Sequence, residues 1–377
     1  MVRIGIVAGE ASGDLLGSHL IQALKQKRPD IEFVGVAGPK MISEGAKSLF
    51  PIERLSVRGY LEVIKHLWGL LKLRRELLNH FLSNPPDLFI GIDAPDFNFW
   101  LEKKLKSKGI KTIHYVSPSI WAWRKNRIKK IKKAVTQVLA LFPFEPALYK
   151  EKGVPVAYVG HPLADMLPME PDVAGAREIL KIETSSLVVA MLPGSRQSEV
   201  EQHADLFVQT AKNIFAQQPN AIFLVPLITR ETRRIFELAI FNEPEQLPIQ
   251  LLFGHAHDAM EAANVVIVAS GTATLEAALL KKPMVITYRM SNLSWQLLKR
   301  MRLQPYVGLP NILAEKFVVP ELLQDDATPE KLAQATLDLI NNKEILAEIK
   351  KEFTNIHFQL KQNTAEKAAI AILSHLK

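Results

Sequence analysis

A turn in the second half of the sequence carries residue types suited to binding phosphate. The apolar run LVVAML, residues 187–192, leads into Gly194, Ser195 and Arg196, and a helical pattern begins directly afterwards. Free backbone N–H groups at a helix start attract anions, and a guanidinium adds charge-assisted hydrogen bonds to phosphate oxygens. The same residues also suit an ordinary turn with a solvent-facing arginine, so this turn alone does not decide the matter.

A second turn of this kind follows the apolar run NVVIVA, residues 264–269. It continues with small and hydroxyl residues and then a carboxylate: Ser270, Gly271, Thr272, Thr274 and Glu276. Small side chains let a diphosphate approach the helix start, and the hydroxyls add donors. Glu276 could accept hydrogen bonds from ribose hydroxyls. Alternatively, it could simply be a carboxylate that the helix dipole stabilises near the start of the helix. Two such turns in one half of the chain favour a nucleotide site.

Other nucleotide and metal signatures are missing from the sequence. Neither GxxxxGK[ST] nor GxGxxG occurs, which argues against triphosphate hydrolysis and nicotinamide binding. No D-x-D pair or histidine cluster predicts a required metal, so we expect neither metal nor cofactor. In the loop YVGLPNILA, Asn311 could hold a leaving phosphate or tie the loop together, and the residues leave both open.

Acidic residues follow two apolar runs in the first half. Asp93 and Asp96, with Asn98, come after DLFIGI. A partly desolvated carboxylate there could take a proton from an attacking hydroxyl, although Asp96 could equally cap the next helix. The loop VAGEASGD after the first run offers a further candidate ligand set, or a turn with a helix cap: Glu10, Ser12, Gly13 and Asp14.

Apolar runs alternating with helical segments must position these residues. The first half has candidate strands at 2–7, 31–36, 87–92, 111–116, 136–141 and 156–159, and the second at 187–192, 221–226, 249–253, 264–269 and 283–288. Continuous apolar strands separated by helices predict α/β domains with doubly wound, Rossmann-like parallel sheets. Ligands collect at the carboxyl ends of such strands. We therefore expect the active site in the cleft between the two domains.

The expected division follows the proline-rich segment 161–186. It gives a first domain at 1–168, a second at 169–345 and a helical tail at 346–377 that packs back on the first domain. The chain has 377 residues, no cysteine and a net charge of +8. A cytoplasmic protein with anionic partners fits these values.

Two segments indicate contact with a membrane surface. Residues 57–78 place polar side chains on a narrow stripe of a helical wheel, and the wide apolar arc includes Leu67, Trp68 and Leu71. Basic residues cluster at 124, 125, 127, 129, 130, 132 and 133, which suits an anionic lipid surface or a solvated helix face. No apolar run approaches the ~20 residues of a membrane span, so a peripheral association is expected.

Seven motifs in order resemble the lipid A disaccharide synthase family, glycosyltransferase family 19. They span nearly the whole chain: AGEASGD, IDAPDFN, HYVSPSIWAWR, GHPLAD, LPGSRQSEV, SGTATLEAAL and GLPNILA. The resemblance implies a GT-B fold and an inverting transfer from UDP-2,3-diacylglucosamine to 2,3-diacylglucosamine 1-phosphate (lipid X). The products would be UDP and a β-1,6-linked tetra-acyl disaccharide 1-phosphate.

The resemblance also implies roles and a location. Asp96 would be the general base, with Asp93 as the second candidate, and Arg196, Glu276 and Asn311 would serve the nucleotide and its leaving diphosphate. The enzyme would be metal-independent and peripheral on the cytoplasmic face of the Gram-negative inner membrane. Some members exchange C-terminal segments, which makes a homodimer through the tail an expectation. The alternatives are another GT-B enzyme, such as a UDP-sugar 2-epimerase or a cell-wall glycosyltransferase, and a basic RNA-binding protein. No RNA-recognition signature supports the last.

Overall fold

The computed structural model describes residues 2–55, 60–121, 127–291, 295–296 and 304–376, and among these it leaves out the side chains of 60–67. The chain divides into two compact units, and each is described by itself. The first unit consists of Met1–Asp165 and Leu360–Lys377, and the second of Met166–Gln359. The predicted tail boundary at 346 therefore needs correction, because residues 346–359 pack within the second unit.

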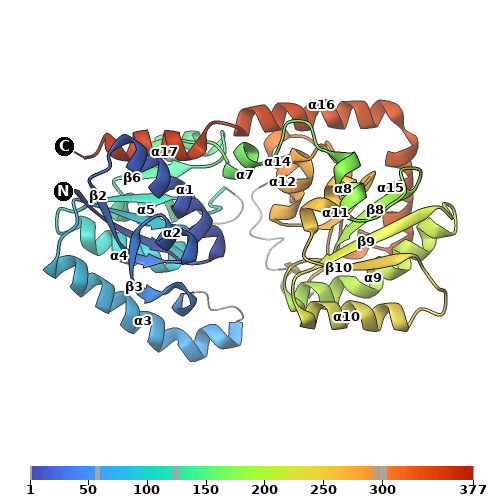
Figure 1. Ribbon diagram of the computed structural model, residues 1–377, viewed down its shortest axis with the longest axis horizontal. Helices are drawn as coiled ribbons and strands as arrows, with labels where there is room; N and C mark the ends of the chain where they lie inside the picture. The colour runs from blue at the N-terminus through green and yellow to red at the C-terminus, as the bar shows by residue number, and fades with distance from the viewer. Residues whose placement is uncertain (1, 56–59, 122–126, 292–294, 297–303, 377) are drawn as a thin grey trace. The chain divides into compact units, whose positions relative to one another are not determined.

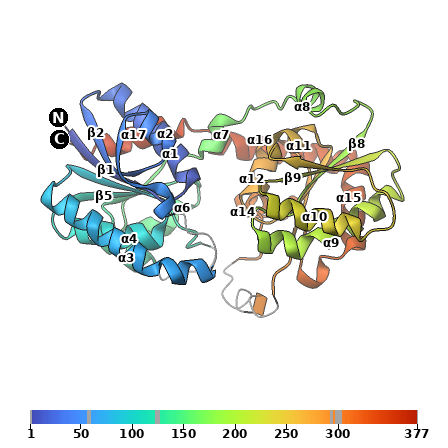
Figure 2. The same cartoon turned by 60° about the horizontal axis from the view of Figure 1, so that its bottom comes forward.

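The first unit contains a parallel sheet of seven strands in the order β3-β2-β1-β4-β5-β6-β7. Strands β1 and β4 are almost completely buried, as continuous apolar runs in a sheet covered on both faces should be. Figure 2 shows α1 and α17 on one side of this sheet and α3 and α4 on the other. The strands are β1 (Val2–Ala8), β2 (Ile31–Ala37), β3 (Ala46–Pro51), β4 (Leu88–Ile92), β5 (Lys111–Tyr115), β6 (Gln137–Ala140) and β7 (Val156–Tyr158).

Helices connect these strands in the usual crossover pattern of an α/β domain. They are α1 (Ala11–Lys27), α2 (Pro39–Ser43), η1 (Ile52–Arg54), α3 (Tyr60–Ser83), α4 (Pro95–Lys106), α5 (Ile128–Ala134), α6 (Glu145–Lys150), α7 (Pro162–Met166) and α17 (Thr364–Leu373). Helix α17 lies beside α1 in Figure 1 and buries Ala368, Ala369 and Ile372 in the core of the first unit. Exchange of this helix between two chains remains a prediction.

The second unit contains a parallel sheet of six strands in the order β10-β9-β8-β11-β12-β13. Its strands are β8 (Leu187–Leu192), β9 (Ala221–Leu227), β10 (Ile249–Phe253), β11 (Val265–Ala269), β12 (Met284–Tyr288) and β13 (Glu321–Leu323). Its helices are α8 (Val173–Ile179), α9 (Gln197–Phe215), α10 (Arg230–Phe241), α11 (Ala256–Ala262), α12 (Thr272–Leu279), α14 (Leu309–Ala314), η3 (Gln324–Asp326), α15 (Pro329–Asn341) and α16 (Lys343–Leu360).

The predicted doubly wound α/β fold is confirmed. Each predicted strand is present, and the structure adds β3 and β13, which the sequence analysis did not predict. β3 lies at the edge of its sheet and is mostly exposed, and β13 has only three residues, so neither has a continuous apolar run. In the parts of the chain that the structure describes, no helix is both long and apolar enough to cross a membrane.

Candidate active site

The two predicted phosphate turns lie at neighbouring strand ends of the second unit. Strands β8 and β11 pair in parallel, with Val268 opposite Leu192 near their carboxyl ends. The connection after β8 leads to β9 on one side, while β11 lies on the other, so this is the topological switch point of the sheet. Ligands of open α/β sheets bind at such a point. The sheet therefore brings together the turns that begin at Gly194 and Ser270.

The turn after β8 differs from the prediction in one respect. The carboxylate of Glu199 accepts the backbone N–H groups of Ser195 and Arg196 through Oε2, at 3.0 and 3.1 Å. These amides were expected to face a phosphate, but an internal carboxylate caps them instead, as in a capping box. The side chain of Arg196 is 79% exposed, with Nη1 3.7 Å from Glu199 Oε1. The guanidinium and the exposed side chain of Ser195, rather than these two amides, are thus the groups at this turn that can reach a ligand.

The turn after β11 keeps its helix start open. Gly271 has φ 154° and ψ −162°, a conformation that is essentially restricted to glycine, and a Cβ added there would have nothing within 4 Å. No side chain caps α12, and both Gly271 and Thr272 are exposed. The first N–H groups of a helix have no acceptor inside it. This turn therefore offers both backbone N–H groups and the accessible Thr272 hydroxyl to an anion.

Two hydroxyl residues of that turn differ in what they can do. Ser270 uses its backbone N–H in a bond to the Thr287 carbonyl, and its side chain is half-buried. Thr274 is completely buried, and its hydroxyl donates to the carbonyl of Gly271 at 2.8 Å. The prediction that Thr274 binds the ligand directly is therefore wrong. Its hydroxyl stabilises the turn and also accepts the N–H of Leu309 at 3.3 Å.

Glu276 lies one turn further along α12 and has a partner that the sequence analysis did not identify. Its Oε2 is 2.9 Å from Nε2 of His257, which stands in the first turn of α11. The hydrogen bond to Glu276 raises the pKa of His257 above its ordinary value. The carboxylate is 20% exposed, so it is accessible but held in one place. This arrangement suits the recognition of hydroxyl groups.

Asn311 does not belong to the ligand-binding set. The residue is completely buried, and its side-chain amide donates to the Val319 carbonyl and to Glu321, both at 2.9 Å. Its Oδ1 accepts the N–H groups of Val318 and Val319 at 2.8 and 3.1 Å. Of the two alternatives in the sequence, the structure selects the one in which Asn311 ties its loop together, because no part of the amide is left for a phosphate.

We expect Asn311→Ala to destabilise the second unit. Leaving a buried donor or acceptor without a partner costs about 1–3 kcal/mol, and this change leaves several. The free energy of unfolding should fall by at least about 2 kcal/mol on the same basis, measured by denaturant titration. Asn341→Ala, at the exposed end of α15, is the matched control and should change it little. Normal stability with impaired nucleotide binding in Asn311→Ala would instead give Asn311 a ligand role.

In the first unit the corresponding switch point lies between β1 and β4. These strands pair in parallel, with Ala8 opposite Ile92 at their carboxyl ends. The two following turns approach closely, because a Cβ added to Gly9 would lie 2.6 Å from the Cβ of Ala94. The sheet thus brings the predicted acidic turn and the predicted first loop to one edge. Glu10 and Ser12, at the start of α1, are both exposed there.

The other two residues predicted in the first loop have structural roles. Asp14 is 4% exposed, and its carboxylate accepts the N–H groups of Lys40 and Met41, both at 3.0 Å. It therefore fixes the start of α2 and has no access to a substrate, which corrects the prediction. Gly13 is buried, and a Cβ there would be in ordinary van der Waals contact with Ala8 at 3.4 Å, so Gly13 belongs to the packed interior of the unit.

Asp96 is the exposed carboxylate of the acidic turn. Its side chain is 82% exposed, and Oδ1 accepts a hydrogen bond from the Arg127 guanidinium. Arg127 belongs to the basic run, which the sequence analysis did not connect with Asp96. Asp93 is half-buried and has φ 50°, in the left-handed region, as does Ala94 with φ 43°. These two residues turn the chain sharply, so that Asp96 stands in the first turn of α4.

Asn98 stabilises the acidic turn through a hydrogen bond to its backbone. It is completely buried, and Nδ2 donates to the carbonyl of Asp93 at 2.8 Å and lies 3.5 Å from that of Val7. One turn further along α4, the buried carboxyl group of Glu102 shares a hydrogen bond with His114, with 2.7 Å between Oε1 and Nδ1. Burial raises the pKa of Glu102, and His114 opposes this. Asn98 therefore links the ends of β1 and β4 and is not a direct substrate contact.

The described apolar side chains of helix α3 divide between the core of the first unit and the protein surface. Leu73, Leu77 and Phe81 repeat at intervals of four and are buried in the core of the first unit. Trp68 is 80% exposed, and Leu71 is half-buried. The side chain of Leu67 lies outside the described residues, as do residues 124 and 125 of the basic run. Lys129, Lys130, Lys132 and Lys133 of α5 are exposed.

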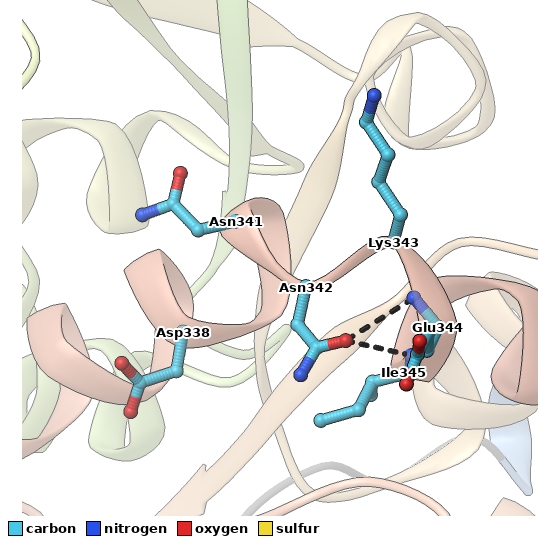
Figure 3. A pocket seen from close by; sticks show the side chains of 6 residues that line it. All are labelled: Asp338, Asn341, Asn342, Lys343, Glu344 and Ile345. Atoms are coloured by element: carbon cyan, nitrogen blue, oxygen red, sulfur yellow. Dashed lines mark hydrogen bonds between the residues drawn. The ribbon is translucent and has the colours of Figure 1, made fainter.

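A hollow at the junction of α15 and α16 is not a candidate active site. Figure 3 shows its side chains pointing in different directions, with Lys343 and Asn341 turned away from one another. Asn342 Oδ1 accepts the N–H groups of Glu344 and Ile345 at 3.1 and 3.0 Å, which caps α16. The side chain of Asn342 therefore serves the helix junction.

Sequence comparison decides between the remaining enzyme classes. The profile of the lipid-A-disaccharide synthetase family matches residues 4–374. The lipid-A-disaccharide synthase of Methylobacillus flagellatus is 68% identical over 378 residues, covering all of both chains. The chain belongs to the lipid-A-disaccharide synthase family. The enzyme of that name from Dechloromonas aromatica is 58% identical over 377 residues, covering 100% of this chain and 99% of the relative.

Solved structures with a similar fold include complexes with UDP and with UDP-GlcNAc. A UDP-GlcNAc 2-epimerase from Neisseria meningitidis, bound to UDP-GlcNAc, has a TM-score of 0.65 at 13% identity, covering 100% of this chain and 99% of that one. The S. aureus MnaA-UDP co-structure has a TM-score of 0.66 at 12% identity, covering 100% and 96%. At these identities the likeness shows the shared GT-B-like fold. Family membership and fold together make the chain a glycosyltransferase of lipid A biosynthesis with a GT-B-like fold.

Proposed function

We propose that this lipid-A-disaccharide synthase binds UDP-2,3-diacylglucosamine at the β8–β11 switch point of its second unit. The observation that carries the proposal is the pairing of β8 with β11, which brings the Arg196 guanidinium and the open start of α12 to one edge of the sheet. Both groups suit the two phosphates of the nucleotide. Glu276 accepts hydrogen bonds from the ribose hydroxyls.

The acceptor in this proposal is 2,3-diacylglucosamine 1-phosphate. Asp96 takes the proton of its 6-hydroxyl through Oδ2, since Arg127 contacts Oδ1. The oxygen attacks the anomeric carbon of the donor as the bond from that carbon to the diphosphate breaks. The new β-1,6 bond forms on the opposite face from the departing group, and UDP leaves with the electron pair of the broken bond.

Charge on the departing diphosphate is stabilised by protein groups in this scheme. The N–H groups at the start of α12 are fixed by the helix before the reaction, so they stabilise the growing charge without reorganisation. The exposed Arg196 guanidinium adds a positive charge at the neighbouring turn. We therefore propose that turnover needs no metal. Purified enzyme given both diacylated substrates in the presence of EDTA should release UDP and the disaccharide. Activity that disappears with EDTA and returns with a divalent cation would contradict this part of the proposal.

We further propose that the enzyme associates peripherally with the cytoplasmic face of the inner membrane, where acylated substrates reside. Trp68 is exposed on α3, and Lys72 and Arg75 are exposed nearby on the same helix. An interfacial helix combines apolar side chains with cations in this way. The exposed lysines of α5 add attraction to anionic lipid, about 1 kcal/mol for each charge near the surface.

Changing Trp68 and Leu71 together to serine should weaken binding to anionic vesicles several-fold, measured by co-sedimentation. The reason is loss of apolar area at the lipid boundary, while UDP affinity should stay at the wild-type value because the second unit is unchanged. Phe241→Ser is the matched control, because Phe241 is 85% exposed on α10 of the second unit. Equal vesicle binding by the double variant and the wild type would show that α3 does not contact lipid.

A further inference from the structure

His257 lies beside the proposed ribose-binding carboxylate, but neither the motifs nor the predicted site includes it. It comes directly after β10, where Gly254 and His255 both have positive φ, 76° and 55°. These two left-handed residues reverse the chain and place His257 in the first turn of α11. Helix α12, with Glu276, starts after β11 at the same carboxyl edge of the sheet, where β9 and β8 lie between β10 and β11. Two segments 19 residues apart thus meet at one hydrogen bond.

The contact between these side chains is well suited to orienting a carboxylate. Nε2 of His257 is 2.9 Å from Oε2 of Glu276, and the histidine is 47% exposed while the carboxylate is 20% exposed. The carboxylate is therefore the more enclosed partner of the pair. One oxygen is held by the histidine, and Oε1 together with the second lone pair of Oε2 can still accept hydrogen bonds.

We propose that His257 is a positioning residue of the donor site, which holds the Glu276 carboxylate in the orientation that accepts the ribose hydroxyls of a uridine diphosphate. This inference rests on the proposed function, because it assumes that Glu276 binds the ribose. An unsupported glutamate has several rotamers, and ordering one of them on binding costs free energy. A hydrogen bond that fixes the rotamer beforehand lowers this cost, as partners of metal-binding side chains do.

The neighbouring histidine provides a matched control. His255 is 54% exposed, lies two residues earlier, and pairs through Nδ1 with Asp258 at 2.7 Å on its own helix. It therefore resembles His257 in exposure and in having an acidic partner, but its partner is not Glu276. A general effect of removing a histidine from this helix start should be the same at both positions.

The test compares the affinities of UDP and 2′-deoxy-UDP by isothermal titration calorimetry. A hydrogen bond to a charged group is worth enough to make UDP bind at least about tenfold more tightly than its deoxy analogue in the wild type. Glu276→Gln should reduce this ratio towards one. His257→Ala should reduce it at least about threefold through a less ordered carboxylate, and His255→Ala should leave it unchanged. His257→Gln, which can donate from a similar position, should restore most of the ratio.

The outcomes separate the two levels of the proposal. A wild-type enzyme that does not distinguish the two nucleotides would overturn the ribose role of Glu276 and, with it, the role of His257. A ratio that is lost in Glu276→Gln but kept in His257→Ala would overturn only the positioning role. An equal loss in His255→Ala and His257→Ala would also overturn it, because the effect would then belong to the helix start as a whole. Circular dichroism of each variant checks that it is folded.

Discussion

The Asp96→Asn enzyme should form disaccharide at least about 100-fold more slowly than the wild type, because general-base catalysis typically contributes factors of that size or larger. Asparagine keeps an oxygen that can accept from Arg127, so the local structure should be preserved. It has no basic oxygen to take the proton of the acceptor hydroxyl. The rate is measured with saturating amounts of both substrates, and UDP affinity by calorimetry should remain at the wild-type value.

Asp93→Asn is the matched control for this experiment. Asp93 has φ 50°, and asparagine tolerates the left-handed conformation as well as aspartate does. This change should therefore be compatible with the fold and should retain most of the activity. If Asp93→Asn abolished turnover while Asp96→Asn kept it, the base would be Asp93, and the exposure of Asp96 would have another purpose.

The second large effect is expected for Arg196→Ala. Because Glu199 already occupies the N–H groups of Ser195 and Arg196, the guanidinium is the charged group of this turn that is left to meet the diphosphate. Removing a preorganised group that stabilises developing charge typically costs about 100–1,000-fold in kcat. We expect a loss in that range in steady-state assays, together with weaker UDP binding.

Two further variants make the Arg196 prediction specific. Arg196→Lys keeps the charge but not the planar pair of donors, so it should recover only part of the rate. Arg233→Ala removes an exposed arginine of α10 that pairs with Glu237 on its own helix, and it should leave kcat unchanged. Wild-type kcat in Arg196→Ala would show that the diphosphate is stabilised elsewhere, with the start of α12 as the next place to examine.

The strands could be predicted well because they are buried on both faces and therefore read as continuous apolar runs. β4 and β11 are completely buried along their length. The edge strand β3 and the three-residue β13 have no such run, and their pairing depends on neighbouring strands rather than on their own composition.

The boundary of the C-terminal tail could not be predicted for a related reason. Helices α16 and α17 are both amphipathic, and sequence alone does not show which unit each helix packs against.

The site could be predicted less fully because polarity in a loop does not reveal its partner. Asp14 and Asn311 were both predicted as ligand contacts, yet Asp14 binds backbone N–H groups, and Asn311 binds backbone groups and the carboxylate of Glu321. The groups that Asp14 binds lie 26 and 27 residues away, so nothing in the local motif indicates them. Thr274 is similar, because its burial depends on how α12 packs.

Some missed residues did carry a signal. Glu199 stands three residues after Arg196, the residue that precedes α9, which is the position of the acidic residue in a capping box. That pattern could have shown that the amides of the turn are occupied. His257 and Arg127 gave no comparable signal, because their carboxylate partners lie 19 and 31 residues away along the chain. The sequence therefore indicated the strand ends that form the candidate site more fully than the groups that support its side chains.

The most direct test of the account is a crystal structure of the enzyme with UDP. We predict that the diphosphate lies against the Arg196 guanidinium and the N–H groups at the start of α12, and that the ribose hydroxyls donate to Glu276 with His257 still bonded to it. UDP bound away from the carboxyl ends of β8 and β11 would contradict the proposed donor site and the catalytic scheme built on it.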